Sequence, residues 1–394
     1  MYMMHMMDVD PALVPIDSRI RVLHVNGSIG INATKMQNDQ AYFSFNDVPV
    51  WDVRFREAMG RWGQMHRSCE LFIANKTFLA DIERSKFDVA ITHQINTCPI
   101  GIIHQQTLMM DAGAALSFVE RVKSFIGQFM FKRMWRSMVS DVETAAFRKE
   151  FGNDFPHLDE LMAKAPLVFV NSNELYDFAR PTLAKVVNIG GIGMKAGESK
   201  PLPQEYTERV GTSRGFAVLT FGSMAPMHLM PEHWTDAYFH AFSQFPDIQF
   251  FIRHENPSAI APRLPPNAMA TKWLPQTDLL QHPKCVGLIT HGGYNSFQEA
   301  VHAGVPMVAT ALWGDQPRNA HLAVHLGFGV NVHKTAMNRE TMSEAVRRLI
   351  EDKTLKQAAQ RLKSMVESRP VSSETLLVKW TEFVAEHKYD ILLS

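Results

Sequence analysis

Residues 287–319 hold the side chains best suited to chemistry in this chain, and they begin with an apolar run that leads into His-Gly-Gly at 291–293. The apolar run is typical of a buried strand, and a helix is predicted directly after the glycines. A helix N-terminus offers free N–H groups and the positive end of the helix dipole to a phosphate, and glycine lets the anion come close. Asn295 and Ser296 in the first turn add donors, and Glu299 on the same face suits the vicinal hydroxyls of a ribose.

Further candidate binding residues follow neighbouring predicted strands, whose carboxyl ends meet along one edge of a parallel sheet. Asp315 and Gln316 offer groups that suit sugar hydroxyls, while Trp273 and Gln276 end another strand, where an indole can stack on a base. Ser223 ends the first strand of the second half and offers a donor to phosphate. Two plainer interpretations stay open: the glycine pair as a tight strand-to-helix turn, and Trp273 as a core residue.

Short apolar runs alternate with longer helical stretches along the whole chain, which is the pattern of parallel α/β layers. Strands are predicted at 19–25, 87–92, 165–172, 185–193, 216–223, 248–254, 268–275, 286–293 and 305–310. Helices are predicted between them, for example at 51–75 and 232–245. The polar segment 194–215, which contains prolines and glycines, is interpreted as an interdomain linker.

Residues 118–151 form an amphipathic helical stretch with basic residues on one side. We interpret this stretch as a helix whose polar face is solvated while its apolar face covers a core. The alternative is a helix at a membrane surface or beside an acceptor substrate.

The composition argues against several classes of function. The chain has 394 residues, 46% of them hydrophobic, which is enough for two domains with cores of their own. Lys plus Arg and Asp plus Glu both number 40, so no basic field is present to bind nucleic acid. The 3 cysteines lack metal-ligand spacing, and we expect them to be small buried residues rather than disulfides or zinc ligands. No apolar run reaches about 18 residues, so no membrane span is predicted.

Residues 273–320, WLPQTDLLQHPKCVGLITHGGYNSFQEAVHAGVPMVATALWGDQPRNA, resemble the signature of the UDP-glycosyltransferase family, the group that contains the UDP-glucuronosyltransferases. The resemblance is nearest to invertebrate members and extends more weakly to VNIGGIG, VLTFGS and LLVKWTEFV. It implies the α/β GT-B fold, with two facing Rossmann-like domains built on parallel sheets. An acceptor-binding domain is expected at 1–195, a UDP-sugar-binding domain at 196–370, and a C-terminal helix at 371–394 that packs back on the first domain.

The resemblance also implies roles for single residues. Trp273 would stack on uracil, Gln276 would contact the uridine, Glu299 would bind the ribose, and Asp315 with Gln316 would bind the sugar. The diphosphate would be held by Ser223, His291, Gly293, Asn295 and Ser296. The donor would be UDP-glucose or UDP-glucuronate, and neither a cofactor nor a metal is expected. The sequence departs from the family at Ala311, where a Pro is usual, which should alter only the shape of a loop.

Catalysis in this family needs a His base in the first domain, oriented by an Asp. The base deprotonates the hydroxyl of a small lipophilic acceptor while the anomeric carbon inverts. No counterpart of that His is found, and His93 stands at the position of the family Asp, where an imidazole supplies no fixed negative charge. The catalytic residues are therefore left unassigned. The chain is also expected to lack the N-terminal start and the C-terminal membrane helix of the family.

The resemblance implies a location on the lumenal side of the endoplasmic reticulum membrane, although neither a signal peptide nor a span is visible in the sequence. Asn26, Asn32 and Asn75 begin glycosylation sequons, which agree with that setting. A homo-oligomer is left open.

The sequence is compatible with three functions. The first is UDP-glycosyl transfer, and the second is UDP-sugar binding by a catalytically impaired homologue or a truncated isoform. The third is another GT-B enzyme such as a nucleotide-sugar epimerase, against which Trp273 and the pair Asp315 and Gln316 argue.

Overall fold

The computed structural model describes most of the chain. The described residues are 2–5, 22–26, 28–29, 33–46, 52–63, 67–85, 118–179, 181–194, 199–222 and 225–387. The predicted strand at 87–92 lies outside these ranges, as do three of the residues considered above, Asn32, His93 and Ser223.

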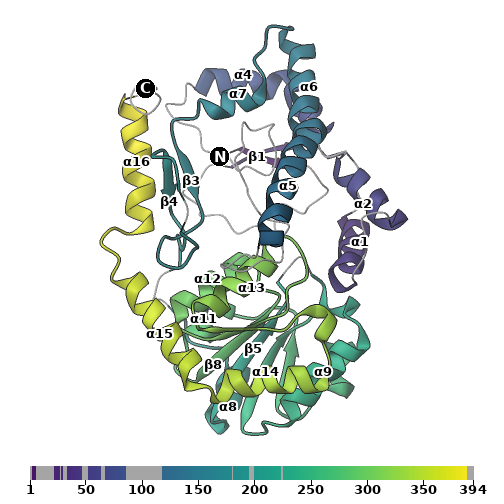
Figure 1. Cartoon of the computed structure of the whole chain (residues 1–394), viewed down its shortest axis with the longest axis vertical. Coiled ribbons are helices and arrows are strands. Elements are labelled where there is room, and N and C mark those ends of the chain that lie inside the picture. Colours follow the sequence, from purple (N-terminus) through teal and green to yellow (C-terminus); the bar gives the residue numbers. More distant parts are fainter. Residues whose placement is uncertain are drawn as a thin grey trace.

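A six-stranded, wholly parallel sheet forms the centre of the C-terminal half (Figure 1). In spatial order its strands are β10 (Gly329–Asn331), β9 (Met307–Ala309), β8 (Cys285–Thr290), β5 (Gly215–Thr220), β6 (Ile248–Arg253) and β7 (Ala268–Thr271). Strands β5 and β8 are apolar runs with almost no exposed surface, as parallel strands covered on both faces should be. The chain moves outward from β5 through β6 to β7 and then crosses back to β8, so the strand order reverses between β5 and β8.

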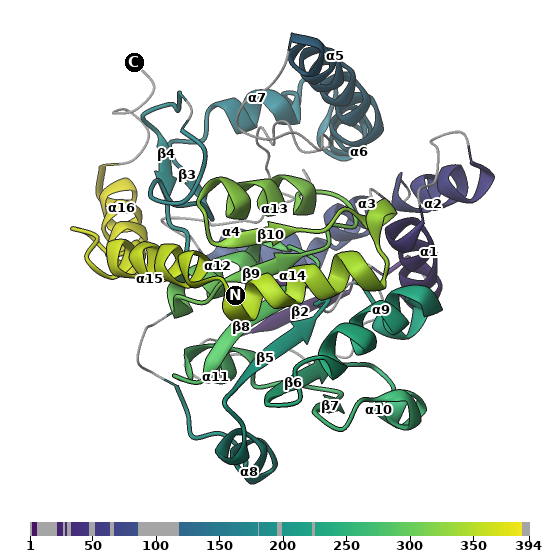
Figure 2. The same cartoon turned by 60° about the horizontal axis from the view of Figure 1, so that its bottom comes forward.

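Helices cover both faces of this sheet, because alternate residues of β5 enter two separate cores. Ala217 and Leu219 pack with α9 (Glu232–Ser243) and α14 (Arg339–Glu351). Phe216 and Val218 pack on the opposite side with α11 (Gln276–Gln281), α12 (Tyr294–Ala303), α13 (Gln316–His325) and α15 (Lys353–Glu367). The sheet is therefore doubly wound, with the helices arranged around it as Figure 2 shows. The remaining short elements are α10 (Pro257–Ile260) and the 3₁₀ turns Met227–Leu229, Ala261–Arg263 and Lys334–Ala336.

The described part of the N-terminal half contains two pairs of parallel strands and a series of helices (Figure 1). β1 (Tyr2–His5) pairs with β2 (Leu23–Asn26), and β3 (Val168–Val170) pairs with β4 (Val186–Asn188). The helices are α1 (Ala33–Phe45), α2 (Val53–Gly63), α3 (Arg67–Ala74), α4 (Lys76–Ser85), α5 (Phe118–Trp135), α6 (Asp141–Phe151) and α7 (Leu158–Ala163). A π-helical turn, Arg136–Ser140, joins α5 to α6.

Most predicted elements are found near their expected positions, although the strands are shorter. The helix predicted after the glycine pair is α12, and the one predicted at 51–75 is divided into α2 and α3. The interpretation of 194–215 as a linker is wrong in part, because α8 (Gln204–Thr212) forms there and buries Tyr206 and Val210 in the core. Strand β10 was not predicted, since its three residues carry little apolar pattern.

The large apolar side chains of α5 that the structure describes are exposed. Phe118 is 79% exposed and Phe125 is 74% exposed, and Phe129 is exposed as well. The prediction of an apolar face turned to a core is therefore wrong for α5. It is correct for α6, which packs on α3 with Ala146 buried.

The prediction for the cysteines is wrong at one position, since Cys69 is disulfide-bonded. Spacing along the sequence does not limit which residues meet in space, so the absence of a CxxC motif was a weak argument. Cys285 is a buried free thiol as predicted, and burial raises its pKa to about 12.

The C-terminal helix α16 (Ser373–His387) lies beside β4 of the N-terminal half (Figure 1). Ser373 Oγ donates a hydrogen bond to the carbonyl oxygen of Gly190 at 2.8 Å, and the Glu374 carboxylate accepts one from the N–H of Gly193 at 3.2 Å. Arg369, just before the helix, pairs with Glu174 at 2.8 Å. The two halves are thus in direct contact, while the domain limits 1–195, 196–370 and 371–394 stay a prediction.

Candidate functional site

The predicted binding residues lie at the carboxyl ends of the strands, where the strand order reverses. β5 and β8 are neighbours, and the chain continues from them toward opposite edges of the sheet. Such a reversal is the usual ligand site of an open α/β sheet. The loop after β5 contains Gly222, and the loop after β8 is His291–Gly293.

The imidazole of His291 is buried between two glycines. A Cβ at Gly222, whose φ is +67°, would lie 2.9 Å from His291 Cε1, and a Cβ at Gly293 would lie 2.7 Å from Nε2. Nδ1 lies 3.2 Å from Thr290 Oγ1, and the ring is stacked on Phe221 with the centroids 6.1 Å apart. Burial lowers the pKa of His291 to about 4, so the ring is neutral at pH 7. A neutral imidazole here has one N–H to donate to an oxygen and brings no charge of its own.

The first turn of α12 presents backbone donors to the same region. Gly293 is the N-cap residue, and no side chain in the described part of the protein caps the helix there. The first bond within the helix runs from the N–H of Phe297 to the carbonyl oxygen of Gly293 at 3.0 Å, so the N–H groups of residues 294–296 precede it. Asn295 is exposed and Ser296 is buried in this turn. The arrangement suits an anion such as a diphosphate.

The carboxylate of Glu299 links α12 to the first turn of α11. It accepts hydrogen bonds from Gln276 Nε2 and from Thr277 Oγ1, the latter at 3.2 Å. Burial raises the pKa of Glu299, although both hydrogen bonds act in the opposite direction. A carboxylate oriented in this way still has lone pairs for two hydroxyl groups. The fold therefore brings together Gln276 and Glu299, two residues that the sequence analysis assigned to the same nucleoside.

Trp273 lies between β7 and α11 with its indole turned to solvent. Trp273 is 78% exposed, and its contact with Thr271 is made by its carbonyl oxygen, which accepts from Oγ1 at 3.1 Å. The alternative that Trp273 is a core residue is therefore wrong. An open indole three residues before Gln276 is available to stack on a flat ring.

Asp315 and Gln316 begin α13 and differ in their surroundings. The side chain of Gln316 is buried, and its Oε1 accepts hydrogen bonds from the N–H groups of Leu312 and Trp313 at 2.9 and 3.1 Å. Gln316 thus braces the loop that leads into the helix. Asp315 is half-buried at the N-cap position, with its carboxylate available for further hydrogen bonds.

Asn319 is a residue of this region that the sequence analysis missed. It is fully buried, and its Nδ2 donates to the carbonyl oxygen of Gly292 at 3.0 Å and to Asp315 Oδ2 at 2.8 Å. Asn319 therefore fixes Asp315 to the loop that carries His291. The available signal was the spacing, because Asn319 stands four residues after Asp315 and thus on the same helix face.

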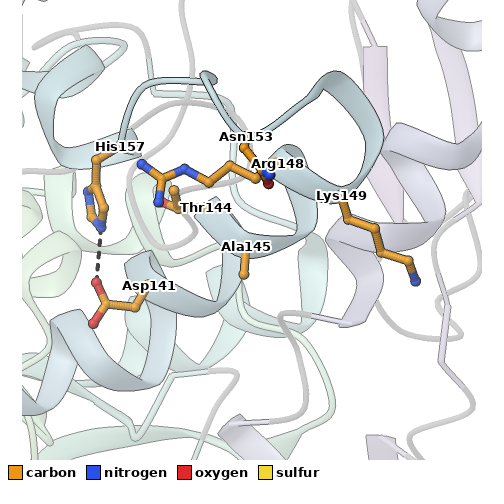
Figure 3. A pocket seen from close by; sticks show the side chains of 7 residues that line it. All are labelled: Asp141, Thr144, Ala145, Arg148, Lys149, Asn153 and His157. Atoms are coloured by element: carbon orange, nitrogen blue, oxygen red, sulfur yellow. Dashed lines mark hydrogen bonds and ion pairs between the residues drawn. The ribbon is translucent and has the colours of Figure 1, made fainter.

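The described N-terminal half contains a His–Asp pair, which lies beside a cavity of about 440 Å³ that Arg148 and Lys149 also line (Figure 3). His157 Nε2 lies 2.9 Å from Asp141 Oδ1, and Nδ1 accepts the N–H of Asp159 at 3.1 Å. Although burial acts against it, hydrogen bonds from His157 and Arg136 lower the pKa of Asp141. Both nitrogens of the imidazole are thus occupied, and neither can accept a proton from a substrate. His157 serves instead as the N-cap of α7.

The described residues contain no group of His, Cys, Asp and Glu side chains placed to hold a metal ion. Within the same residues, no helix has the length and apolar character needed to cross a membrane.

Comparison with known proteins gives consistent results. Residues 99–390 match the family model described as UDP-glucoronosyl and UDP-glucosyl transferase. The putative UDP-glucuronosyltransferase ugt-48 of Caenorhabditis elegans is 26% identical over 402 aligned positions, which cover 92% of this chain and 76% of the relative. UDP-glucuronosyltransferase 3A1 of Bos taurus is 32% identical over 352 positions, which cover 81% of this chain and 66% of the relative.

The chain spans about two thirds of the length of several mammalian relatives that it matches. Among solved structures, the glycotransferase of kitacinnamycin superposes with a TM-score of 0.51 at 19% identity, over 67% of this chain and 66% of that one. The predicted fold class is confirmed, namely α/β with parallel sheets in the GT-B arrangement.

Proposed function

Because the chain belongs to the family of UDP-glucuronosyl and UDP-glucosyl transferases, we propose that it transfers a sugar from a UDP-sugar to the hydroxyl of a small lipophilic acceptor. The sugar is a hexosyl or glucuronosyl group, and the configuration at its anomeric carbon is inverted. The observation that supports this proposal best is the joint geometry of His291, the first turn of α12 and the Gln276–Glu299 pair. These groups supply donors for a diphosphate beside acceptors for a ribose.

In this proposal each part of the UDP-sugar has its own set of residues. The exposed indole of Trp273 stacks on uracil, and Gln276 and Glu299 hold the uridine through the base and the ribose hydroxyls. Asp315 and Gln316 bind the sugar hydroxyls. The diphosphate is held by Ser223, His291, Gly293, Asn295 and Ser296.

The reaction breaks the bond between the anomeric carbon and the β-phosphate oxygen. The acceptor oxygen forms its bond to that carbon from the opposite face and gives its proton to a base, while UDP leaves with an added negative charge. The N–H groups of α12 and the neutral His291 stabilise this charge where it develops, because they are already oriented. The base itself is left unassigned.

A second candidate function is UDP-sugar binding without transfer. The missing counterpart of the family His base motivates it, and His157 does not replace that base because both of its nitrogens are occupied. His93, which stands where the family has its Asp, lies outside the described residues.

Calorimetric titration with UDP tests the binding site that both functions share. Glu299→Gln should weaken UDP binding about tenfold, because a half-buried carboxylate that accepts ribose hydroxyls is lost. Glu344→Gln removes an exposed carboxylate of α14 and should change nothing. A wild-type protein that does not bind UDP contradicts both functions.

Release of UDP from UDP-glucose and UDP-glucuronate, measured with a panel of phenols and sterols as acceptors, distinguishes sugar transfer from UDP-sugar binding alone. Acceptor-dependent release supports transfer. Tight binding of the UDP-sugar with no release from any acceptor supports binding alone.

We also propose a lumenal setting in the endoplasmic reticulum. The disulfide at Cys69 supports it, because such bonds persist in oxidising compartments. The exposed sequon at Asn75, which lies between α3 and α4, agrees with it.

A further inference from the structure

A short segment of the N-terminal half, residues 171–178, lies against the two helices that carry most of the candidate site. Gln298 of α12 is fully buried, and its Nε2 donates to the carbonyl oxygen and to the Oδ1 of Asn171 at 3.2 and 3.1 Å. Its Oε1 accepts a glycine N–H from the turn after β4 at 3.0 Å. Arg318, in the first turn of α13, forms an ion pair with Asp177 of the same segment. Both helices are therefore fixed to one piece of the N-terminal half.

The ion pair between Asp177 and Arg318 is shielded from water. The two side chains are 7% and 15% exposed. The second carboxylate oxygen of Asp177 accepts the hydroxyl of Ser172, and the Arg318 guanidinium lies over the ring of Phe178, 5.3 Å from its centroid. Removing one partner of a buried ion pair leaves the other charge unpaired at a large cost, so each side chain strongly constrains the other.

Arg318 shares its helical turn with the residues assigned to the sugar. Gln316 stands two positions before it, and Asn319, directly after it, holds Asp315 at 2.8 Å. This turn is therefore fixed from inside the C-terminal half by Asn319 and from the N-terminal half by Asp177. The residues assigned to uracil and ribose lie instead before and within α11 and on α12.

We propose that Asp177 is a positioning residue for the sugar half of the donor site. It acts through Arg318, which sets the orientation of the first turn of α13 and with it Asp315 and Gln316. The inference rests on the proposed function of this site, and it adds a residue from the N-terminal half to the determinants of UDP-sugar binding. Loss of the ion pair therefore weakens binding of the sugar and spares binding of the nucleotide.

The test compares two ligands on one variant. Asp177→Asn keeps the shape of the side chain and removes its charge. By calorimetry, Kd for UDP should change less than twofold, whereas Kd for UDP-glucose or UDP-glucuronate, whichever the wild type binds more tightly, should rise about tenfold, the cost of one or two misaligned hydrogen bonds. Glu344→Gln, which breaks an exposed ion pair with Arg347, should change neither value.

Equal weakening for UDP and UDP-sugar, or no weakening for either, overturns the inference and leaves the proposed function intact. Failure of the wild type to bind UDP contradicts the proposed function, and the inference falls with it. Should Asp177→Asn fail to fold, the double variant Asp177→Asn, Arg318→Met removes both buried charges, which restores stability but not the link. That double variant should show the same selective loss, and UDP-sugar binding equal to that of the wild type overturns the inference.

Discussion

Replacing Trp273 by Ala should weaken UDP binding strongly while leaving the fold intact. The residue is 78% exposed, and its hydrogen bond with Thr271 is made by its main-chain oxygen, which the substitution keeps. Substitutions at exposed positions of this kind change the free energy of unfolding by no more than about 0.5 kcal/mol. Any larger effect on UDP binding must therefore come from contact between the indole and the ligand.

The size of the effect follows from the proposed stacking on uracil. Replacing an aromatic platform for a base by Ala removes about 1–3 kcal/mol of binding free energy. This corresponds to a rise in Kd of roughly 5- to 150-fold. Inorganic pyrophosphate has no base, so Trp273→Ala should bind it as the wild type does. Trp273→Phe keeps a ring and should give an intermediate Kd for UDP.

Calorimetric titration with UDP and with pyrophosphate measures both values, and a thermal melt of each variant checks the fold. Trp313→Ala is a suitable control, because Trp313 is also a partly exposed indole and is not assigned to the nucleotide. A Kd for UDP within twofold of the wild type, or an equal loss for UDP and pyrophosphate, would refute the stacking.

Three further predictions concern other parts of the protein. In the folded protein the pKa of His291 is lowered to about 4, whereas in the unfolded chain the imidazole is protonated near pH 6.5. Protonation below that pH therefore favours the unfolded chain, and the free energy of unfolding should fall by up to about 2 kcal/mol between pH 7 and pH 5. Urea titrations at the two pH values should show a smaller fall for His291→Gln. Gly293→Ala places a Cβ 2.7 Å from the imidazole and should raise Kd for UDP at least about tenfold, as calorimetry can measure. Gly211→Ala, whose Cβ meets nothing within 4 Å, should not change Kd. Secreted or lumenal expression should give a glycan at Asn75, seen as an endoglycosidase-sensitive mass that Thr77→Ala removes and Thr77→Ser retains.

Each of these predictions has a contrary outcome. An equal loss of stability at pH 5 in His291→Gln would mean that other groups cause the pH dependence. Unchanged UDP binding in Gly293→Ala would show that UDP binding does not depend on the position of the His291 imidazole. An unmodified Asn75 in protein recovered from the lumen would remove one support for the lumenal setting.

The C-terminal half could be predicted because its local sequence patterns agree with the way its elements pack in the tertiary structure. Apolar runs such as 216–220 and 286–290 are buried on both faces of the sheet, so their composition alone identifies them as strands. The glycine pair at 292–293 marks a sharp turn into a helix, and the helix starts at Tyr294 as predicted. Sequence reasoning therefore placed these residues at the carboxyl ends of the strands, where the structure has them.

The features that sequence reasoning missed depend on contacts between distant residues. Asn319 acquires its importance from the carbonyl oxygen of Gly292, and Arg318 from Asp177, neither of which a local pattern reveals. The exposed apolar face of α5 shows the opposite failure. Its helical periodicity is genuine, but periodicity does not say whether a face meets a core or water.

Contacts between distant residues also cross the predicted domain limit between residues 195 and 196. Tyr176 stands before that limit, yet it is fully buried in the core of the C-terminal half, where its ring centroid lies 5.9 Å from that of Phe297. Asp177, next to it, pairs with Arg318 of α13. A fragment that begins at residue 196 would lack both residues, so the predicted limit separates side chains that pack together.

We therefore expect fragment 166–387 to be clearly more stable than fragment 196–387. Loss of a buried aromatic side chain such as Tyr176 costs about 3–5 kcal/mol. For a unit of this size, the lower value corresponds to a fall in Tm of about 6–12 °C. Thermal melts of the two fragments measure the difference, and Tyr176→Ala in the longer fragment should account for much of it. Equal Tm values would mean that the core closes without residues 166–195, and the limit at 195 would then hold for packing.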